Sequence, residues 1–125
     1  MKVLVDSSIW IDYFRSGVRS SRLDELIDED LIVTNELILV ELIPVLRLQK
    51  QRRLIRLLET IRLVPIEIGW SQLTELQVKC LRKGINRIGI PDLIIAQQAM
   101  GQNLILYTLD KHFQLLKKHF SLALF

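Results

Sequence analysis

Cysteine is almost missing from the sequence, and this scarcity excludes several kinds of protein. Cys80 is the only cysteine among 125 residues, so the chain cannot form an internal disulfide and has no Cys-x-x-Cys zinc pattern. A chain without disulfides suits a reducing compartment. We therefore expect a cytoplasmic protein in which Cys80 is a small buried apolar residue.

Long apolar runs are missing as well. Asp6 interrupts the apolar stretch at the N-terminus, and Glu41 and Pro44 interrupt the most hydrophobic segment. No run approaches the roughly 18 residues that a membrane helix needs, and the first residues lack the pattern of a signal peptide. We expect no membrane span and no secretory leader. Repeats, linkers and low-complexity tracts are also absent.

What the sequence does contain is an alternation of strand and helix patterns. Half of the residues are hydrophobic, which is enough for one core, so residues 1–125 are predicted to form a single domain. The predicted strands are 2–6, 31–33, 63–68, 103–107 and 121–125, and the predicted helices are 9–15, 20–29, 35–48, 50–60, 70–83, 91–101 and 110–118. This order predicts an α/β fold, a three-layer α/β/α sandwich around a mostly parallel sheet of four to five strands.

Four acidic residues occupy positions where acids are unusual. Asp6 ends an apolar strand and Asp110 follows another, at the edge of an α/β sheet where ligands bind. Glu41 shares a helix stripe with Leu37, Ile38, Val45 and Leu48, and Asp92 begins a stripe with Ile95, Ala96 and Ala99. Those spacings predict that Glu41 and Asp92 point toward the sheet rather than into solvent.

Buried carboxylates need a cation, a hydrogen-bond donor or a proton. One shared metal ion would satisfy all four acids, and an all-oxygen ligand set suits Mg²⁺ or Mn²⁺ better than zinc. His112 and His119 are expected to be surface residues rather than ligands. Each acid also has a purely structural explanation. Asp110 can cap the last helix, Asp92 suits a helix N-terminus, and Glu41 can pair with a basic residue.

Four motifs in order give the sequence a family resemblance. They are residues 5–14 (VDSSIWIDYF), 40–42 (VEL), 91–96 (PDLIIA) followed by Ala99, and 107–113 (YTLDKHF). Together they resemble the PIN domain over the whole chain, and specifically the VapC toxins of bacterial toxin–antitoxin pairs. Two positions depart from the family pattern. The glycine often found after the second-motif glutamate is absent, and Ser8 stands where many members have Asn or Thr.

The resemblance implies both a fold and an activity. It implies a sheet in the order 3-2-1-4-5 and endonucleolytic cleavage of RNA by a Mg²⁺- or Mn²⁺-dependent toxin that has a cognate antitoxin and forms a homodimer. It assigns metal binding and catalysis to Asp6, Glu41, Asp92 and Asp110. Thr108 would orient a carboxylate or a water molecule, Ser8 would hydrogen bond weakly, and cleavage would leave a 5′-phosphate and a 3′-hydroxyl.

Basic residues gather in two segments, and the chain carries a formal charge of +3. The candidate RNA-binding residues among them are Arg47, Arg52, Arg53, Arg56, Lys83 and Arg87. The alternatives are that these residues form solvated helix faces or pair with the acidic block at residues 24–30. The aromatic residues Trp10, Tyr13 and Phe14 are expected to be core, with a groove for an antitoxin as the alternative.

Three other functions remain as rivals. A receiver-like phosphoacceptor domain would need an early acidic pair and a later lysine, which the sequence does not supply. A hydrolase with an aspartate nucleophile would need Asp-x-Asp, but Ser8 occupies the second position. A catalytically silent PIN-like module used only for binding is disfavoured because all four acids are present. No Ser–His–Asp or Cys–His arrangement suggests covalent catalysis.

Overall fold

Four short strands and seven helices make up the chain, and the computed structural model describes all 125 residues. The strands are β1 (Val3–Val5), β2 (Ile32–Thr34), β3 (Arg62–Leu63) and β4 (Ile105–Tyr107). The helices are α1 (Ser7–Phe14), α2 (Leu23–Asp28), α3 (Glu36–Leu48), α4 (Arg52–Thr60), α5 (Trp70–Arg82), α6 (Ile90–Gly101) and α7 (Lys111–His119). The predicted alternation of strands and helices is confirmed.

The four strands form one parallel sheet in the order β3-β2-β1-β4. The predicted last strand, residues 121–125, is reduced to a single parallel bridge between Leu106 and Leu124 beside β4. Two backbone hydrogen bonds hold that bridge, from Leu106 to Ala123 and from Phe125 to Leu106, each 2.9 Å long. The order 3-2-1-4-5 is therefore present, with its fifth member as a bridge.

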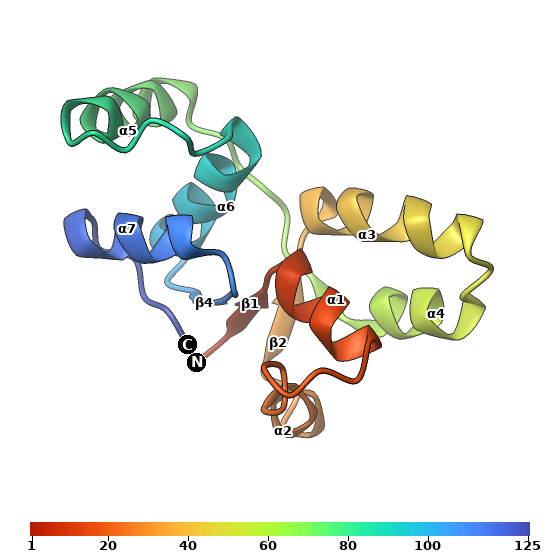
Figure 1. Cartoon of the computed structure of the whole chain (residues 1–125). Coiled ribbons are helices and arrows are strands. Elements are labelled where there is room, and N and C mark those ends of the chain that lie inside the picture. Colours follow the sequence, from red (N-terminus) through yellow and green to blue (C-terminus); the bar gives the residue numbers. More distant parts are fainter.

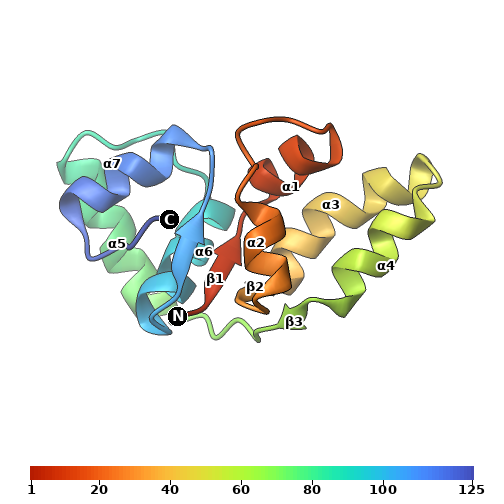
Figure 2. The same ribbon diagram turned by 90° about the horizontal axis from the view of Figure 1, so that it is seen from below.

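Six of the seven helices form two groups that flank the strands. In both views α1, α3 and α4 lie on one side of the molecule and α5, α6 and α7 on the other (Figures 1 and 2). This arrangement agrees with the predicted three-layer fold class. None of the helices has the length and apolar character needed to cross a membrane.

The core forms around the two central strands. All three residues of β1 are fully buried, as the short apolar run predicts for a parallel strand covered on both faces. Trp10 on α1 is also fully buried, whereas Tyr13 and Phe14 are half-buried and pack against the core. The core prediction is thus confirmed for Trp10 and holds partly for the other two aromatic residues. Cys80 is a buried free cysteine, as predicted.

The third predicted strand, residues 63–68, is mostly wrong. Only Arg62 and Leu63 pair with β2, and after them Val64 makes one more bond, from its N–H to the carbonyl of Thr34. Pro65 has no N–H to continue a ladder. The carbonyls of Val64 and Pro65 instead accept hydrogen bonds from the side chain of Gln98 on α6. Side-chain amides thus take the place of a neighbouring strand.

The buried face of α3 differs from the predicted stripe. Its buried residues are Ile38, Leu42 and Leu46, whereas Val45 is 54% exposed and Leu48 is 85% exposed. Successive helical residues are about 100° apart, so Glu41 lies at the border of this face rather than at its centre. The prediction that Glu41 is turned away from solvent is wrong in that respect, since the residue as a whole is exposed. Pro44 lies inside α3, as predicted.

Candidate metal centre

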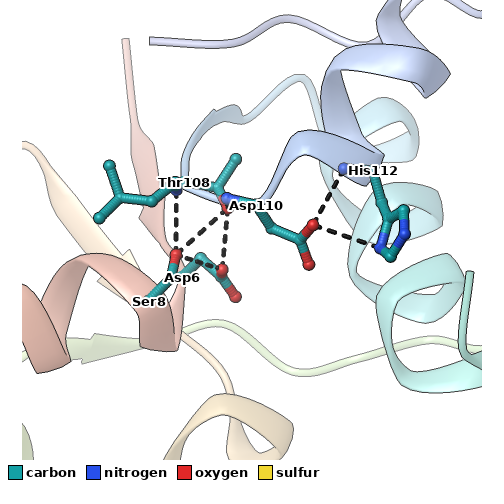
Figure 3. Close-up of polar contacts among 6 residues, drawn as sticks. Asp6, Ser8, Thr108, Asp110 and His112 are labelled. Carbon is teal, nitrogen blue, oxygen red and sulfur yellow. Dashed lines mark hydrogen bonds and ion pairs between the residues drawn. The ribbon is translucent and has the colours of Figure 1, made fainter.

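Asp6 and Thr108 follow directly after β1 and β4, which are neighbouring parallel strands, and so meet at one edge of the sheet (Figure 3). Asp6 is 5% exposed, and its Oδ2 accepts two hydrogen bonds. One comes from the Ser8 hydroxyl at 2.7 Å and the other from the Thr108 hydroxyl at 2.9 Å. The carboxylate of Asp6 is therefore held in one orientation, and its Oδ1 makes no hydrogen bond within the chain.

The two hydroxyls are themselves fixed by the backbone. Ser8 Oγ accepts a hydrogen bond from Leu109 N at 3.0 Å, and Thr108 Oγ1 accepts one from Asp110 N at 3.0 Å. Each hydroxyl thus donates to Asp6 and accepts from the loop that carries Asp110. This network links the α1 side of the site to the β4–α7 loop and holds the hydroxyls of Ser8 and Thr108 against Asp6. The supporting roles of these two residues in metal binding stay predictions.

Asp110 makes two contacts with one residue, His112, at the start of α7. Its Oδ1 accepts a hydrogen bond from His112 N at 2.9 Å and lies 3.3 Å from His112 Nδ1 (Figure 3). Asp110 is therefore an N-cap, which is the structural alternative raised from the sequence. One ligand atom each from Asp92, Asp110 and His112 also lie within 4.8 Å of one another, so capping and metal binding are compatible.

Asp92 stands in the first turn of α6 after Pro91, on the helix face that buries Ile95, Ala96 and Ala99. This confirms the predicted stripe. The residue is half-buried, yet its carboxylate makes no hydrogen bond and no ion pair with a lysine or arginine. Burial raises the pKa of Asp92, and the charges of Asp110 and Asp6 raise it further, against an opposing effect of His112.

Glu41 reaches the same site from α3. Burial of its carboxyl group raises its pKa, as do the charges of Asp6 and Asp92, while a hydrogen bond from the Ser7 hydroxyl at 3.3 Å lowers it. Glu41 as a whole residue is exposed, but its carboxyl group is partly buried. That group lies close enough to two other acids for their negative charges to raise its pKa. No basic side chain pairs with Glu41, so that structural alternative is wrong.

The four predicted acids are thus electrostatic neighbours, and their donor set fits a hard divalent cation. Carboxylate oxygens are the preferred ligands of Mg²⁺ and Mn²⁺, and the free Oδ1 of Asp6 and the unpartnered carboxylate of Asp92 are available to such an ion. His112 is the residue that sequence reasoning missed, because it was expected at the surface. Its position in the sequence could have indicated it, because His112 lies two residues after Asp110 at the start of the same helix.

The basic residues predicted to bind RNA are all exposed. They form no salt bridge, because Arg22–Glu25 is the only ion pair of a lysine or arginine in the chain. Pairing of the basic segments with the acidic block is therefore wrong. The turn between α3 and α4 lies at the opposite side of the molecule from α5 and α7 in both views (Figures 1 and 2). The two basic segments therefore lie on different sides of the molecule.

We expect removal of either hydroxyl next to Asp6 to weaken metal binding. Thr108→Val or Ser8→Ala leaves Asp6 Oδ2 with a single donor, and loss of a partner behind a metal ligand typically costs about 10- to 100-fold in affinity or activity. Thr108→Ser keeps the hydroxyl and is the matched control. Titration with Mn²⁺, followed by melting temperature, measures the change. Equal affinity of Thr108→Val and Thr108→Ser would contradict this role.

Comparison with known proteins agrees with this geometry. A PIN domain model matches residues 3–118, while no curated protein matches the chain. VapBC2 from Rickettsia felis bound to promoter DNA has a TM-score of 0.79 at 22% identity, covering 100% of this chain and 98% of that chain. VapBC-1 from nontypeable Haemophilus influenzae has a TM-score of 0.74 at 23% identity, covering 100% and 97%.

A third solved structure, Mycobacterium tuberculosis VapC20, is described as a toxin that cleaves the sarcin-ricin loop. It has a TM-score of 0.62 at 16% identity, covering 92% of this chain and 95% of that chain. Likeness at these identities shows the shared fold. The family model covers nearly the whole chain and includes all four acids of the site. The chain belongs to the PIN-domain family.

Proposed function

We propose that this chain is a Mg²⁺- or Mn²⁺-dependent endoribonuclease and the toxin of a toxin–antitoxin pair. The observation that carries the proposal is Asp92, a half-buried carboxylate with no partner in the chain and with other acids around it. A group of like charges in this position is costly unless a cation is bound. The fixed orientation of the Asp6 carboxylate, held by hydrogen bonds from Ser8 and Thr108, supports the same conclusion.

In this proposal Asp6, Glu41, Asp92 and Asp110 hold the cation, directly or through water. A bound Mg²⁺ or Mn²⁺ would supply an activated water and would offset charge on the phosphodiester. Ser8 and Thr108 keep the Asp6 carboxylate in one orientation. His112 holds Asp110 from the other side, through its backbone N–H and its ring.

Cleavage of structured RNA in the presence and absence of Mn²⁺ tests the activity. We expect Mn²⁺-dependent internal cuts with 5′-phosphate and 3′-hydroxyl ends, detected by end-labelling, and no cuts in EDTA. A catalytically silent binding module would retain RNA without cutting it in either condition. Phosphorylation of an aspartate by acetyl phosphate, without RNA cleavage, would favour the receiver-like alternative.

An antitoxin is the proposed protein partner. The Rickettsia felis and Haemophilus influenzae structures with the same fold are described as VapBC. On this chain, a groove of about 330 Å³ lies between α1, α3 and α4 and reaches Glu41. Its apolar lining includes Ile11, Phe14, Leu42 and Leu54, which suits an amphipathic peptide. Phe14 lines this groove and would take the antitoxin-binding role predicted as the alternative to a core role, whereas Trp10 is fully buried and does not line the groove.

The basic segments are proposed to bind the RNA backbone. Each phosphate contact contributes a slope of roughly 0.7 to 0.9 to the logarithmic salt dependence of affinity. We expect the double variant Arg52→Glu, Arg53→Glu, and separately Arg87→Glu, to weaken RNA binding about tenfold at low salt and to flatten that dependence. Binding to catalytically inactive protein, measured by fluorescence anisotropy, avoids cleavage. Lys118→Glu on α7 is the charge-matched control for Arg87→Glu, and the double variant Lys117→Glu, Lys118→Glu is the charge-matched control for the arginine pair. The same loss in the control would show a general effect of net charge.

The proposed homodimer has a candidate surface on α3. Val40 is 67% exposed and Leu48 is 85% exposed, with Glu36 and Arg47 at opposite ends of the same helix face. Two antiparallel copies of α3 about a twofold axis would place each Glu36 beside the partner's Arg47 and bury the apolar residues between them.

Val40→Glu should convert the dimer to a monomer in light scattering, because it puts two like charges into that contact. Val18→Glu, at a residue 83% exposed in a turn, should leave the mass unchanged. A Val40→Glu variant with the same mass as the wild-type protein would contradict the proposed surface. A cytoplasmic location and a single domain over residues 1–125 stay predictions.

A further inference from the structure

Two buried side-chain amides join the helices that carry Glu41 and Asp92. Asn35 is fully buried and Gln98 is 3% exposed. The Asn35 Nδ2 group donates a hydrogen bond of 2.7 Å to Gln98 Oε1. We call this pair the Asn35–Gln98 bridge.

Every polar atom of the bridge has a partner. Asn35 Oδ1 accepts a hydrogen bond from Ile38 N at 2.8 Å and thereby caps α3. Gln98 Nε2 donates to the carbonyls of Val64 at 3.2 Å and Pro65 at 3.3 Å. A buried amide with an unmet hydrogen bond is destabilising, whereas a fully paired network fixes the distance and orientation of the groups it joins.

The placement of the bridge relates it to the site. Asn35 precedes Glu41 by six residues at the start of α3, and Gln98 follows Asp92 by six residues on α6. It is the only hydrogen bond that joins α3 and its cap to α6. Apolar contacts alone permit small shifts between packed elements, but this directional bond does not.

We propose that Asn35 and Gln98 are positioning residues that set the separation of Glu41 and Asp92 and so the affinity of the site for a divalent cation. This proposal rests on the function proposed above. Two apolar side chains could fill the same space without the cost of removing polar groups from water. The two amides therefore act by fixing the geometry of the helices rather than by adding stability to the core.

Two further side chains offer matched controls, one on α6 and one on the residue directly after it. Gln102 Nε2 donates to the Pro65 carbonyl at 3.3 Å, and Gln97 forms two hydrogen bonds with the backbone of Gly69. Both attach α6 to the segment after β3, as Gln98 does, but neither reaches α3. Gln102→Ala therefore removes a comparable bond without breaking the bridge.

Mn²⁺ affinity of Asn35→Ser, Gln98→Met and the double variant is the first measurement. Serine retains a cap for α3 but is too short to reach Gln98. We expect each single variant to raise the Kd for Mn²⁺ about tenfold, the double variant to add no more than twofold, and Gln102→Ala to match the wild-type Kd. Single variants with wild-type affinity, or independent effects that multiply in the double variant, would overturn the proposal. Should Asn35→Ser fail to fold, Gln98→Met tests the bridge from its other end.

The second measurement needs no metal. Spin labels on cysteines introduced at Val45 and Gly101, with Cys80 replaced by alanine, report the separation of α3 and α6 by double electron–electron resonance. Dilution with unlabelled protein removes distances between copies. We expect a narrow distribution in the parent protein and in Gln102→Ala, and a shifted or broadened one in Asn35→Ser and Gln98→Met. An unchanged distribution would overturn the positioning role. A wild-type chain without Mn²⁺ affinity would instead contradict the proposed function, while the label distances still decide the role of the bridge.

Discussion

Asp6→Asn and Asp92→Asn should each abolish metal-dependent RNA cleavage and leave the fold intact. The amide has the size of the carboxylate but carries no charge, so the site loses a ligand without losing volume. Loss of a residue that only supports a metal ligand already costs about 10- to 100-fold, so we expect a loss beyond ~100-fold for a ligand itself. Rates of cleavage at saturating Mn²⁺, with circular dichroism as the check of folding, provide the measurement.

Asp28→Asn is the control for this experiment. It makes the same chemical change and the same change in net charge at an exposed residue of α2, away from the acids of the site. We expect it to retain wild-type activity. Cleavage at the wild-type rate by Asp6→Asn or Asp92→Asn would show that the observed activity does not come from this site.

Mn²⁺ should raise the melting temperature of the chain strongly at neutral pH. A ligand at one hundred times its Kd adds about 2.7 kcal/mol to the free energy of unfolding. For a domain of this size that corresponds to a shift of roughly 10 °C. Differential scanning fluorimetry with increasing Mn²⁺ measures the shift. An unchanged melting temperature at millimolar metal would count against a shared cation site.

The pH dependence of the metal-free chain follows from the raised pKa values of Glu41 and Asp92. An acid with a raised pKa holds its proton more tightly in the folded state than in the unfolded state. The free energy of unfolding therefore falls as the pH rises through the interval between the ordinary values, 4.5 for Glu and 3.8 for Asp, and the raised ones. Above that interval the full destabilisation is present.

The Asp92→Asn variant also tests the predicted direction of this pH dependence. Without metal at neutral pH, Asp92→Asn should melt at a higher temperature than the wild-type chain, because one of the repelling charges is gone. The difference should shrink as the pH falls toward 4 and the wild-type carboxyl group is protonated. With Mn²⁺ the order reverses, since only the wild-type chain binds the ion fully. A lower metal-free melting temperature for Asp92→Asn would show that Asp92 has a stabilising partner.

The elements that the sequence predicted well are those fixed by local pattern. The buried strand before Asp6 and the Asp92 stripe on α6 are both confirmed, because a short apolar run and a spacing of three or four residues each have one good structural solution. The helix predicted over residues 35–48 begins as expected, with Asn35 as its N-cap, because a short polar side chain there accepts a hydrogen bond from Ile38 N. Local signals of this kind need no knowledge of distant residues.

The predictions that failed depend on residues far away in the sequence. The strand at residues 63–68 ends early because the side chain of Gln98, more than thirty residues later, binds its carbonyls. Glu41 lies at the border of a buried face because Ile38, Leu42 and Leu46 are the residues that meet the core. His112 joins Asp92 only because the β4–α7 loop and α6 meet in space.

By itself the sequence determined the alternation of strands and helices and the identity of four acids at strand ends and helix faces, since apolar periodicity and the cost of isolated charge act along the chain. Tertiary structure alone decided which oxygen of Asp6 is held by Ser8 and Thr108, which neighbouring acids raise the pKa of Glu41 and of Asp92, and how Asn35 meets Gln98. These contacts join residues up to 102 positions apart. Packing of the whole sheet and its helices is what brings such residues within hydrogen-bond distance.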